Sequence, residues 1–172
     1  MGDSGLLASL MYRPANDEKK RDIGIIAHWT LKGKIEEYIE TAEEMFSDKT
    51  IEVLNMGNPE LDCNDLFEFI CSSKVIVSCS LHGIIFAHSF GVPALYFSDA
   101  RAAYKFMDYY SVYDGIDYGD LARKTTLEDA LNHIEDEKFI ESVNPSHEDV
   151  QKIQRSIVNA LPYKQCFTGM AK

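Results

Sequence analysis

The sequence predicts an α/β fold in which a doubly wound, mainly parallel sheet carries helices on both faces. Four short segments are mainly apolar, and three of them lack polar alternation, which is typical of strands buried on both faces. Segments with a helical spacing of apolar residues separate these runs, and such alternation is typical of a parallel sheet. The four expected strands are Ile23–Ala27, Ile51–Leu54, Val75–Ser78 and Ala94–Phe97.

The helices follow from the spacing of apolar residues and from helix-ending residues. Between the first two strands, residues 34–46 place Ile35, Tyr38 and Ala42 on one side of a helix. A helix that begins at Leu81 must end before Gly91 and Pro93, which are typical of helix termination. The other expected helices are 61–73, 102–110, one starting near Thr126, and 147–161, with a turn at 144–146 before the last.

We expect three parts along the chain. Residues 1–21 form an N-terminal helix and a charged loop, and residues 22–162 form the α/β lobe. Residues 163–172, which follow the helix-ending Pro162, form a mobile tail.

Composition excludes several classes of protein. The 172 residues carry a formal net charge of −11, whereas nucleic acids and anionic membrane surfaces require a basic face. An anionic substrate must therefore be held by a local arrangement of groups. No apolar stretch is long enough to span a membrane, and the start lacks the pattern of a signal peptide. The four cysteines form no CxxC pair, so we expect reduced thiols, no metal site and a cytoplasmic location.

The turn between the third strand and the following helix is the first candidate binding site. Ser80 is placed to cap the helix that begins at Leu81. In open α/β sheets, ligands bind at the carboxyl ends of the strands, where a helix N-terminus offers N–H groups to an anion. The alternative is an ordinary turn in which His82 is hydrogen-bonded inside the protein.

This stretch resembles the C-terminal signature of the polysaccharide pyruvyl transferase family: a buried strand, a Ser-rich turn, Leu-His-Gly, an apolar helix, Gly-φ-Pro (φ apolar) and another strand. Three further segments are similar to the family in the same order and spacing, across residues 2 to 118. They are Gly2–Leu7, similar to Gly-Asp-Pro-x-Leu-Leu; Asp22–His28, similar to (V/I)GI(I/V)xH; and Lys105–Tyr110, similar to (F/Y)KxxDYY. Two departures stand out: many members carry Arg where this chain has Ser80, and the family's N-terminal half is not in this sequence.

The resemblance implies one Rossmann-like lobe of a two-lobed GT-B-type fold. It also implies enolpyruvyl transfer from phosphoenolpyruvate to two hydroxyls of a sugar, in exopolysaccharide or cell-surface glycan synthesis. The products are a ketal and phosphate, and no cofactor is expected besides phosphoenolpyruvate as donor substrate. This chemistry requires cationic or N–H groups for the anions, a proton donor for the methylene carbon and a base for the hydroxyls.

His82 is the candidate catalytic residue, because an imidazole at a helix start beside a phosphate can stay protonated and donate a proton. Four residues of the same turn are candidate substrate-binding residues: Ser78, Ser80, Leu81 and Gly83. Gly83 would allow the backbone and a ligand to approach closely.

His28 and two basic residues extend this candidate site. His28 ends the first strand at the same edge of the sheet, and Arg101 and Lys105 follow the fourth strand, so all three are candidate substrate-binding residues. The alternatives are a histidine without a role and ion pairs between the basic residues and nearby carboxylates. His88 lies about 240° around the helix from His82, so the two cannot form a helical metal pair.

Three functions fit the sequence: a pyruvyl transferase lobe, a GT-B glycosyltransferase lobe that binds a nucleotide-sugar, and a non-catalytic binding or assembly module derived from the transferase. No acidic residue is clearly placed for a ribose, which disfavours the second. The expected partners are phosphoenolpyruvate and a glycan acceptor, with a second copy or a separate N-terminal-lobe chain opposite. We expect Trp29, Tyr109 and Tyr110 to be exposed at that interface, and the chain alone to be catalytically poor.

Overall fold

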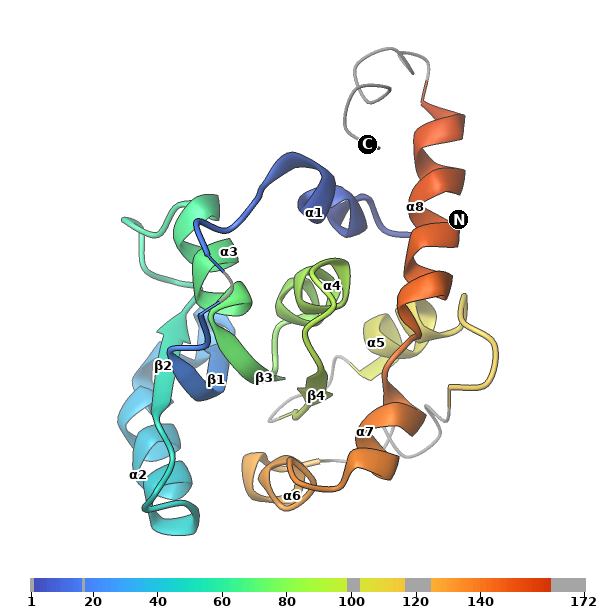
Figure 1. Cartoon of the computed structure of the whole chain (residues 1–172). Helices are drawn as coiled ribbons and strands as arrows, with labels where there is room; N and C mark the ends of the chain where they lie inside the picture. Colours follow the sequence, from blue (N-terminus) through green and yellow to red (C-terminus); the bar gives the residue numbers. More distant parts are fainter. Residues whose placement is uncertain (1, 17, 99–102, 117–124, 162–172) are drawn as a thin grey trace.

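The computed structural model describes residues 2–16, 18–98, 103–116 and 125–161 of the chain. Its centre is a parallel sheet with the strand order β2-β1-β3-β4 (Figure 1). The four strands are β1 Arg21–Ala27, β2 Ile51–Asn55, β3 Ser73–Ser78 and β4 Ala94–Tyr96. All four lie where the sequence predicts strands, and every pairing is parallel, so the predicted fold class is confirmed.

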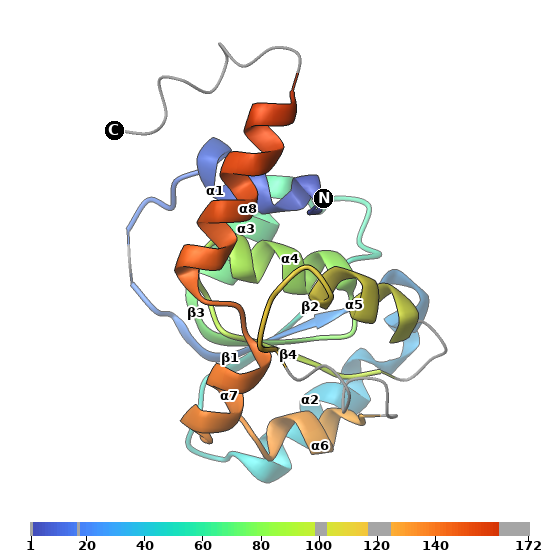
Figure 2. The ribbon, with the colours of Figure 1, turned by 90° about the vertical axis from the view of Figure 1, so that its right-hand side faces the viewer.

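Helices lie on both faces of this sheet, as a doubly wound fold requires. Figure 2 shows α1, α3, α4, α5 and α8 on one side, and α2, α6 and α7 on the other. The helices are η1 Ser4–Leu7, α1 Ala8–Met11, η2 Trp29–Lys34, α2 Ile35–Met45, α3 Cys63–Cys71, α4 Leu81–Ser89, α5 Ala103–Tyr110, α6 Leu127–Leu131, α7 Glu137–Val143 and α8 His147–Ala160.

Two hydrophobic cores form because successive strand side chains point to opposite faces of the sheet. On β3, Ile76 packs into the core below α3, α4, α5 and α8, whereas Val75 and Val77 pack into the core with α2, α6 and α7. The continuous apolar runs in the sequence follow from this arrangement, since both faces of the central strands are buried.

β2 departs from the prediction that all four strands are buried. Its residues are half-buried, and Glu52 is exposed, because β2 is an edge strand with only β1 as its neighbour. β4 is also an edge strand, yet Ala94, Leu95 and Tyr96 are buried. Asn144, at the end of α7, covers this edge by accepting a hydrogen bond from the backbone N–H of Ala94 at 2.8 Å.

The helix ends agree with the sequence signals. Thr126 caps α6 with a capping box that Asp129 completes. Gly91, just after α4, adopts a φ of +68°, a conformation in which a side chain would be strained. The chain can therefore reverse directly from α4 into β4.

The N-terminal segment packs against α4 and α8. Leu6 is fully buried, and its carbonyl accepts hydrogen bonds from Ser89 Oγ and Gln154 Nε2, both at 2.7 Å. Asp3 begins η1 by accepting a hydrogen bond from the N–H of Gly5 at 2.7 Å. These contacts hold the segment against the end of α4 and against α8, while Gly2 and Asp3 lie near Leu81 at the start of α4.

Candidate functional site

The predicted site residues that follow β1 and β3 lie together at the carboxyl edge of the sheet. The backbone N–H of His28 donates to Cys79 Sγ at 3.2 Å, and the N–H of Cys79 donates to the carbonyl of Ile26 at 3.3 Å. Parallel pairing of β1 and β3 makes this convergence unavoidable, because both strands end at the same edge.

The polar residues of the turn before α4 are buried and engaged with one another. Ser78 Oγ accepts a hydrogen bond from the N–H of Ser80 at 3.0 Å and lies 3.3 Å from the carbonyl of Ile26. Ser80 takes the N-cap position, although its side chain makes no capping hydrogen bond. A Cβ on Gly83 would collide with Ser78 Oγ, so glycine here permits α4 to approach β3 closely. These residues therefore shape the turn, whatever ligand it meets.

His82 is exposed at the first turn of α4. Its ring lies against Phe86, with 5.7 Å between the ring centroids. Leu81 before it is half-buried. The alternative of a hydrogen-bonded core histidine does not describe His82, which faces solvent where the helix N-terminus offers N–H groups.

Lys105 lies close enough to His28 for its positive charge to act on the imidazole. Partial burial lowers the pKa of the His28 imidazole below its ordinary value, and the positive charge of Lys105 lowers it further. His28 Nδ1 also lies 2.8 Å from Thr30 Oγ1. Both effects favour the neutral form of the imidazole. Arg101, the remaining predicted site residue, lies outside the described residues.

A cavity of about 210 Å³, called the edge pocket below, unites three segments that are far apart in the sequence. The N-terminal segment contributes its first residues, and α4 contributes Leu81 at its start. The third segment is α5, which includes Lys105, together with the turn that follows this helix. These are three of the four segments on which the family resemblance rests. The lining residues are Gly2, Asp3, Leu81, Lys105, Asp108, Tyr109 and Val112.

The edge pocket contains acidic residues that the sequence does not assign to a binding site. Asp3 and Asp108 line it together with Lys105. Their signal in the sequence is only their position inside the Gly2–Leu7 and Lys105–Tyr110 segments. The carboxylate oxygens can accept hydrogen bonds from the hydroxyl groups of a ligand. Lys105 can in addition attract an anion to the same pocket.

The prediction that Trp29, Tyr109 and Tyr110 are exposed at an interface is only partly correct. Trp29 is 61% exposed, as predicted, but Tyr109 and Tyr110 are 6% and 1% exposed. The expectation for the two tyrosines is wrong because α5 turns them into the core against α4, where Tyr110 packs edge-on to His88 with 5.7 Å between the ring centroids.

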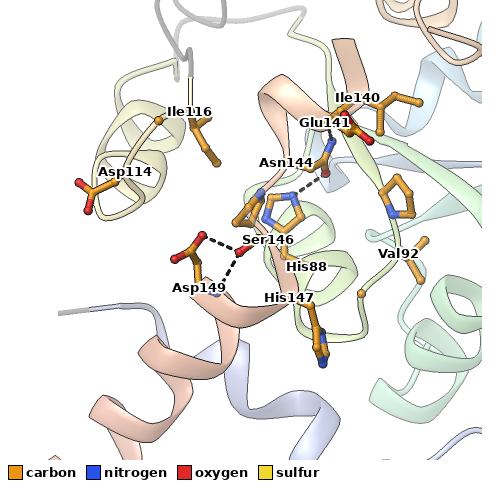
Figure 3. Close-up of a pocket in the computed structure, with 14 residues that line it drawn as sticks. His88, Val92, Asp114, Ile116, Ile140, Glu141, Asn144, Ser146, His147 and Asp149 are labelled. Atoms are coloured by element: carbon orange, nitrogen blue, oxygen red, sulfur yellow. Dashed lines mark hydrogen bonds between the residues drawn. The ribbon is translucent and has the colours of Figure 1, made fainter. Parts of the chain in front are cut away.

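A larger cavity, of about 470 Å³, lies at the opposite edge of the sheet, where β4 begins (Figure 3). Four of its polar side chains are already paired with one another: Asn144 Oδ1 lies 3.0 Å from His88 Nε2, and Ser146 Oγ donates to Asp149 Oδ2 at 2.6 Å. A ligand that contacts these four groups would have to displace these bonds. The edge pocket is therefore the better candidate site despite its smaller volume.

Within the described ranges, no three side chains of His, Cys, Asp or Glu come together in a geometry that could hold a metal ion. None of the helices in the same ranges is long and apolar enough to cross a membrane.

An open parallel sheet with a polar pocket outside the carboxyl ends of its strands is the arrangement in which α/β folds commonly bind ligands. The family model of the polysaccharide pyruvyl transferases matches residues 2–100, more than half of the chain. The chain therefore belongs to the polysaccharide pyruvyl transferase family. The matched residues include two of the three segments that line the edge pocket.

Among curated proteins, the chain is similar to an uncharacterized protein of Acanthamoeba polyphaga mimivirus, with 35% identity over 133 residues. The match covers 74% of this chain and 44% of the relative, so the chain spans less than half the length of that relative. No solved structure matches the chain significantly.

Proposed function

We propose that this chain is the phosphoenolpyruvate-binding lobe of a pyruvyl transferase that acts on a sugar. The observation that carries the proposal is the convergence of the family's segments on the edge pocket, beside the exposed start of α4. In the reaction, one hydroxyl proton goes to the methylene carbon of phosphoenolpyruvate and the other leaves with phosphate. Both sugar oxygens then bond to the central carbon, which becomes a ketal.

The anionic donor would bind between Lys105 and the N-terminus of α4. Lys105 supplies the local positive charge that a chain of net charge −11 otherwise lacks. The first N–H groups of α4 have no partner within the helix, so they are available to a phosphate or carboxylate. Ser78, Ser80, Leu81 and Gly83 would act by presenting this backbone.

Proton transfer would involve the two histidines at this edge. His82, exposed at the helix start, would donate to the methylene carbon while it contacts the phosphate. His28, whose lowered pKa favours the neutral imidazole, would accept a proton from a sugar hydroxyl. Asp3 and Asp108 would hold the hydroxyls through their carboxylate oxygens.

Turnover would require a surface opposite this lobe. Alignment of two reactants supplies on the order of 7–11 kcal/mol of barrier reduction, which one open edge cannot provide. Trp29, next to His28 in the sequence, and Tyr104, next to Lys105, are 61% and 66% exposed, and they would meet a second copy or an N-terminal-lobe chain. A cytoplasmic place of action is part of the proposal.

The test is calorimetric titration of the purified chain with phosphoenolpyruvate, inorganic phosphate and a UDP-sugar. We expect phosphoenolpyruvate to bind more tightly than phosphate, and His82→Ala to lose at least about tenfold in affinity, as for a charged hydrogen bond. His147→Ala, which alters an exposed histidine near the amino edge of the sheet, is the matched control and should bind like the wild type.

Two results would contradict the proposal. Tighter binding of the UDP-sugar would favour a glycosyltransferase lobe. Absence of binding by all three ligands, in a chain that melts cooperatively, would favour a non-catalytic assembly module.

A further inference from the structure

Four polar side chains, three of them buried, form a continuous hydrogen-bonded chain between the larger cavity at the start of β4 and the edge pocket. Tyr113 Oη lies 3.0 Å from Tyr109 Oη, Tyr109 Oη lies 2.8 Å from His88 Nδ1, and His88 Nε2 lies 3.0 Å from Asn144 Oδ1. The first three side chains are between 4% and 6% exposed. The proposed function uses none of these bonds.

The direction of every bond in this chain follows from Asn144. The backbone N–H of Ala94 can only donate, so the Asn144 atom 2.8 Å from it is the oxygen. Asn144 Nδ2 in turn donates to the carbonyl of Ile140 at 2.8 Å. Because Asn144 Oδ1 can only accept, His88 Nε2 must carry a proton (Figure 3).

The imidazole of His88 has one proton, not two. Burial lowers the pKa of His88 to about 3, and the rings of Tyr109 and Tyr110 and the amide of Asn144 that surround it carry no charge. Nδ1 is therefore bare and accepts a hydrogen bond from Tyr109. Tyr109 Oη, having donated its proton, accepts from Tyr113.

This directed chain fixes the orientation of α5 on α4. Phe106 and Tyr110 of α5 are buried, and apolar packing of this kind is not directional. The bond from Tyr109 to His88 adds a direction, because it forms at one rotation of α5 only. Tyr109 also lines the edge pocket, one helical turn from Lys105 and next to Asp108.

We infer that His88 is a positioning residue of the edge pocket: its bare Nδ1 holds the Tyr109 hydroxyl and so sets where Lys105 and Asp108 stand. The part of this inference that concerns a bound ligand rests on the proposed function. The part that concerns α5 does not.

A matched pair of substitutions separates the two bonds of His88. In His88→Asn the amide oxygen can occupy the place of Nδ1 and still accept from Tyr109. In His88→Gln the amide nitrogen can occupy the place of Nε2 and still donate to Asn144. Both variants replace a buried ring with an amide, so a merely structural role predicts similar effects on α5.

Amide hydrogen exchange of the two variants, with α4 as internal reference, tests the inference without any ligand. We expect the amides of α5 to exchange about tenfold faster in His88→Gln, and at the wild-type rate in His88→Asn, relative to α4. Equal acceleration in both variants, or in neither, would overturn the inference. The ¹⁵N shifts of His88 in the wild type must also show a bare Nδ1 and a protonated Nε2, and the opposite tautomer would overturn it as well.

Titration with phosphoenolpyruvate then extends the test to the site. We expect His88→Gln to lose affinity about tenfold and His88→Asn to retain it. If the wild type does not bind phosphoenolpyruvate, the proposed function fails, while the exchange and tautomer measurements still decide the role of His88. If the wild type binds and both variants bind alike, the link from His88 to the pocket is refuted.

Discussion

The helix α4 carries two histidines, His82 and His88, whose surroundings are opposite. His82 is exposed at the first turn, beside the edge pocket, with its ring against Phe86. His88 is buried at the last turn, and both of its ring nitrogens are hydrogen-bonded. The same side chain is thus available for ligand chemistry at one end of the helix and holds elements together at the other. The difference comes from helix rotation and from what packs on each face, not from the residue type.

Replacing each histidine with leucine should give the largest contrast. His88→Leu leaves the buried Tyr109 hydroxyl without its acceptor, and we expect a loss of about 2–3 kcal/mol in the free energy of unfolding. His82→Leu changes an exposed position and should stay within about 0.5 kcal/mol. Urea denaturation of the two variants beside the wild type measures both values. Equal losses would show that His82 is also packed.

Acidification should reveal the burial of His88, because the lowered pKa of this residue makes the stability of the fold depend on pH. Burial lowers this pKa from 6.5 to about 3, so between these values the unfolded chain binds a proton that the folded chain does not. The stability that His88 contributes is therefore lost as the pH falls below 6.5. From pH 6.5 to pH 5 the loss is roughly 2 kcal/mol.

The measurement is urea denaturation at pH 7 and pH 5 for the wild type and for His88→Asn, whose amide does not titrate. We expect the variant to lose less stability on acidification, by roughly the same 2 kcal/mol. Parallel losses in the two proteins would mean that His88 titrates normally in the folded state.

Gly83, the residue after His82, tests how tightly the exposed end of α4 is fixed. Gly83→Ala adds a methyl group that collides with Ser78 Oγ, which outweighs the gain in helix propensity, so we expect a net loss of about 1–2 kcal/mol. In a Ser78→Ala background the collision is relieved. The two substitutions should therefore be coupled in a double-mutant cycle, and simple additivity would argue against this contact.

The smallest expected effect concerns the charges around the edge pocket. The positive charge of Lys105 adds to burial in lowering the pKa of His28, so Lys105→Met should raise that pKa toward its ordinary value. NMR titration of the histidines measures the shift, and Lys152→Met, on α8, is the charge-matched control. An unchanged pKa of His28 in Lys105→Met would show that the charge of Lys105 does not act on His28.

The sequence alone determined the four parallel strands, most of the helices and the ends of α4, but it predicted one helix where the structure has α6 and α7. These features depend on local signals: β-branched apolar runs, helical spacing, the φ of Gly91 and the ring of Pro93. It also placed His28 and His82 at one edge, because strands that run parallel must end at the same side of the sheet.

Only the tertiary structure decided which surfaces remain accessible. Tyr109 and Tyr110, which the sequence analysis expects at an exposed interface, are buried because α5 packs onto α4 and His88 accepts a hydrogen bond from the Tyr109 hydroxyl. Asp3 and Lys105 line the same pocket, although they are far apart in the sequence, because η1 packs across α4. β2 is half-exposed because no further strand joins that edge among the described residues. Such contacts join residues that no local pattern relates, and packing between elements selects them.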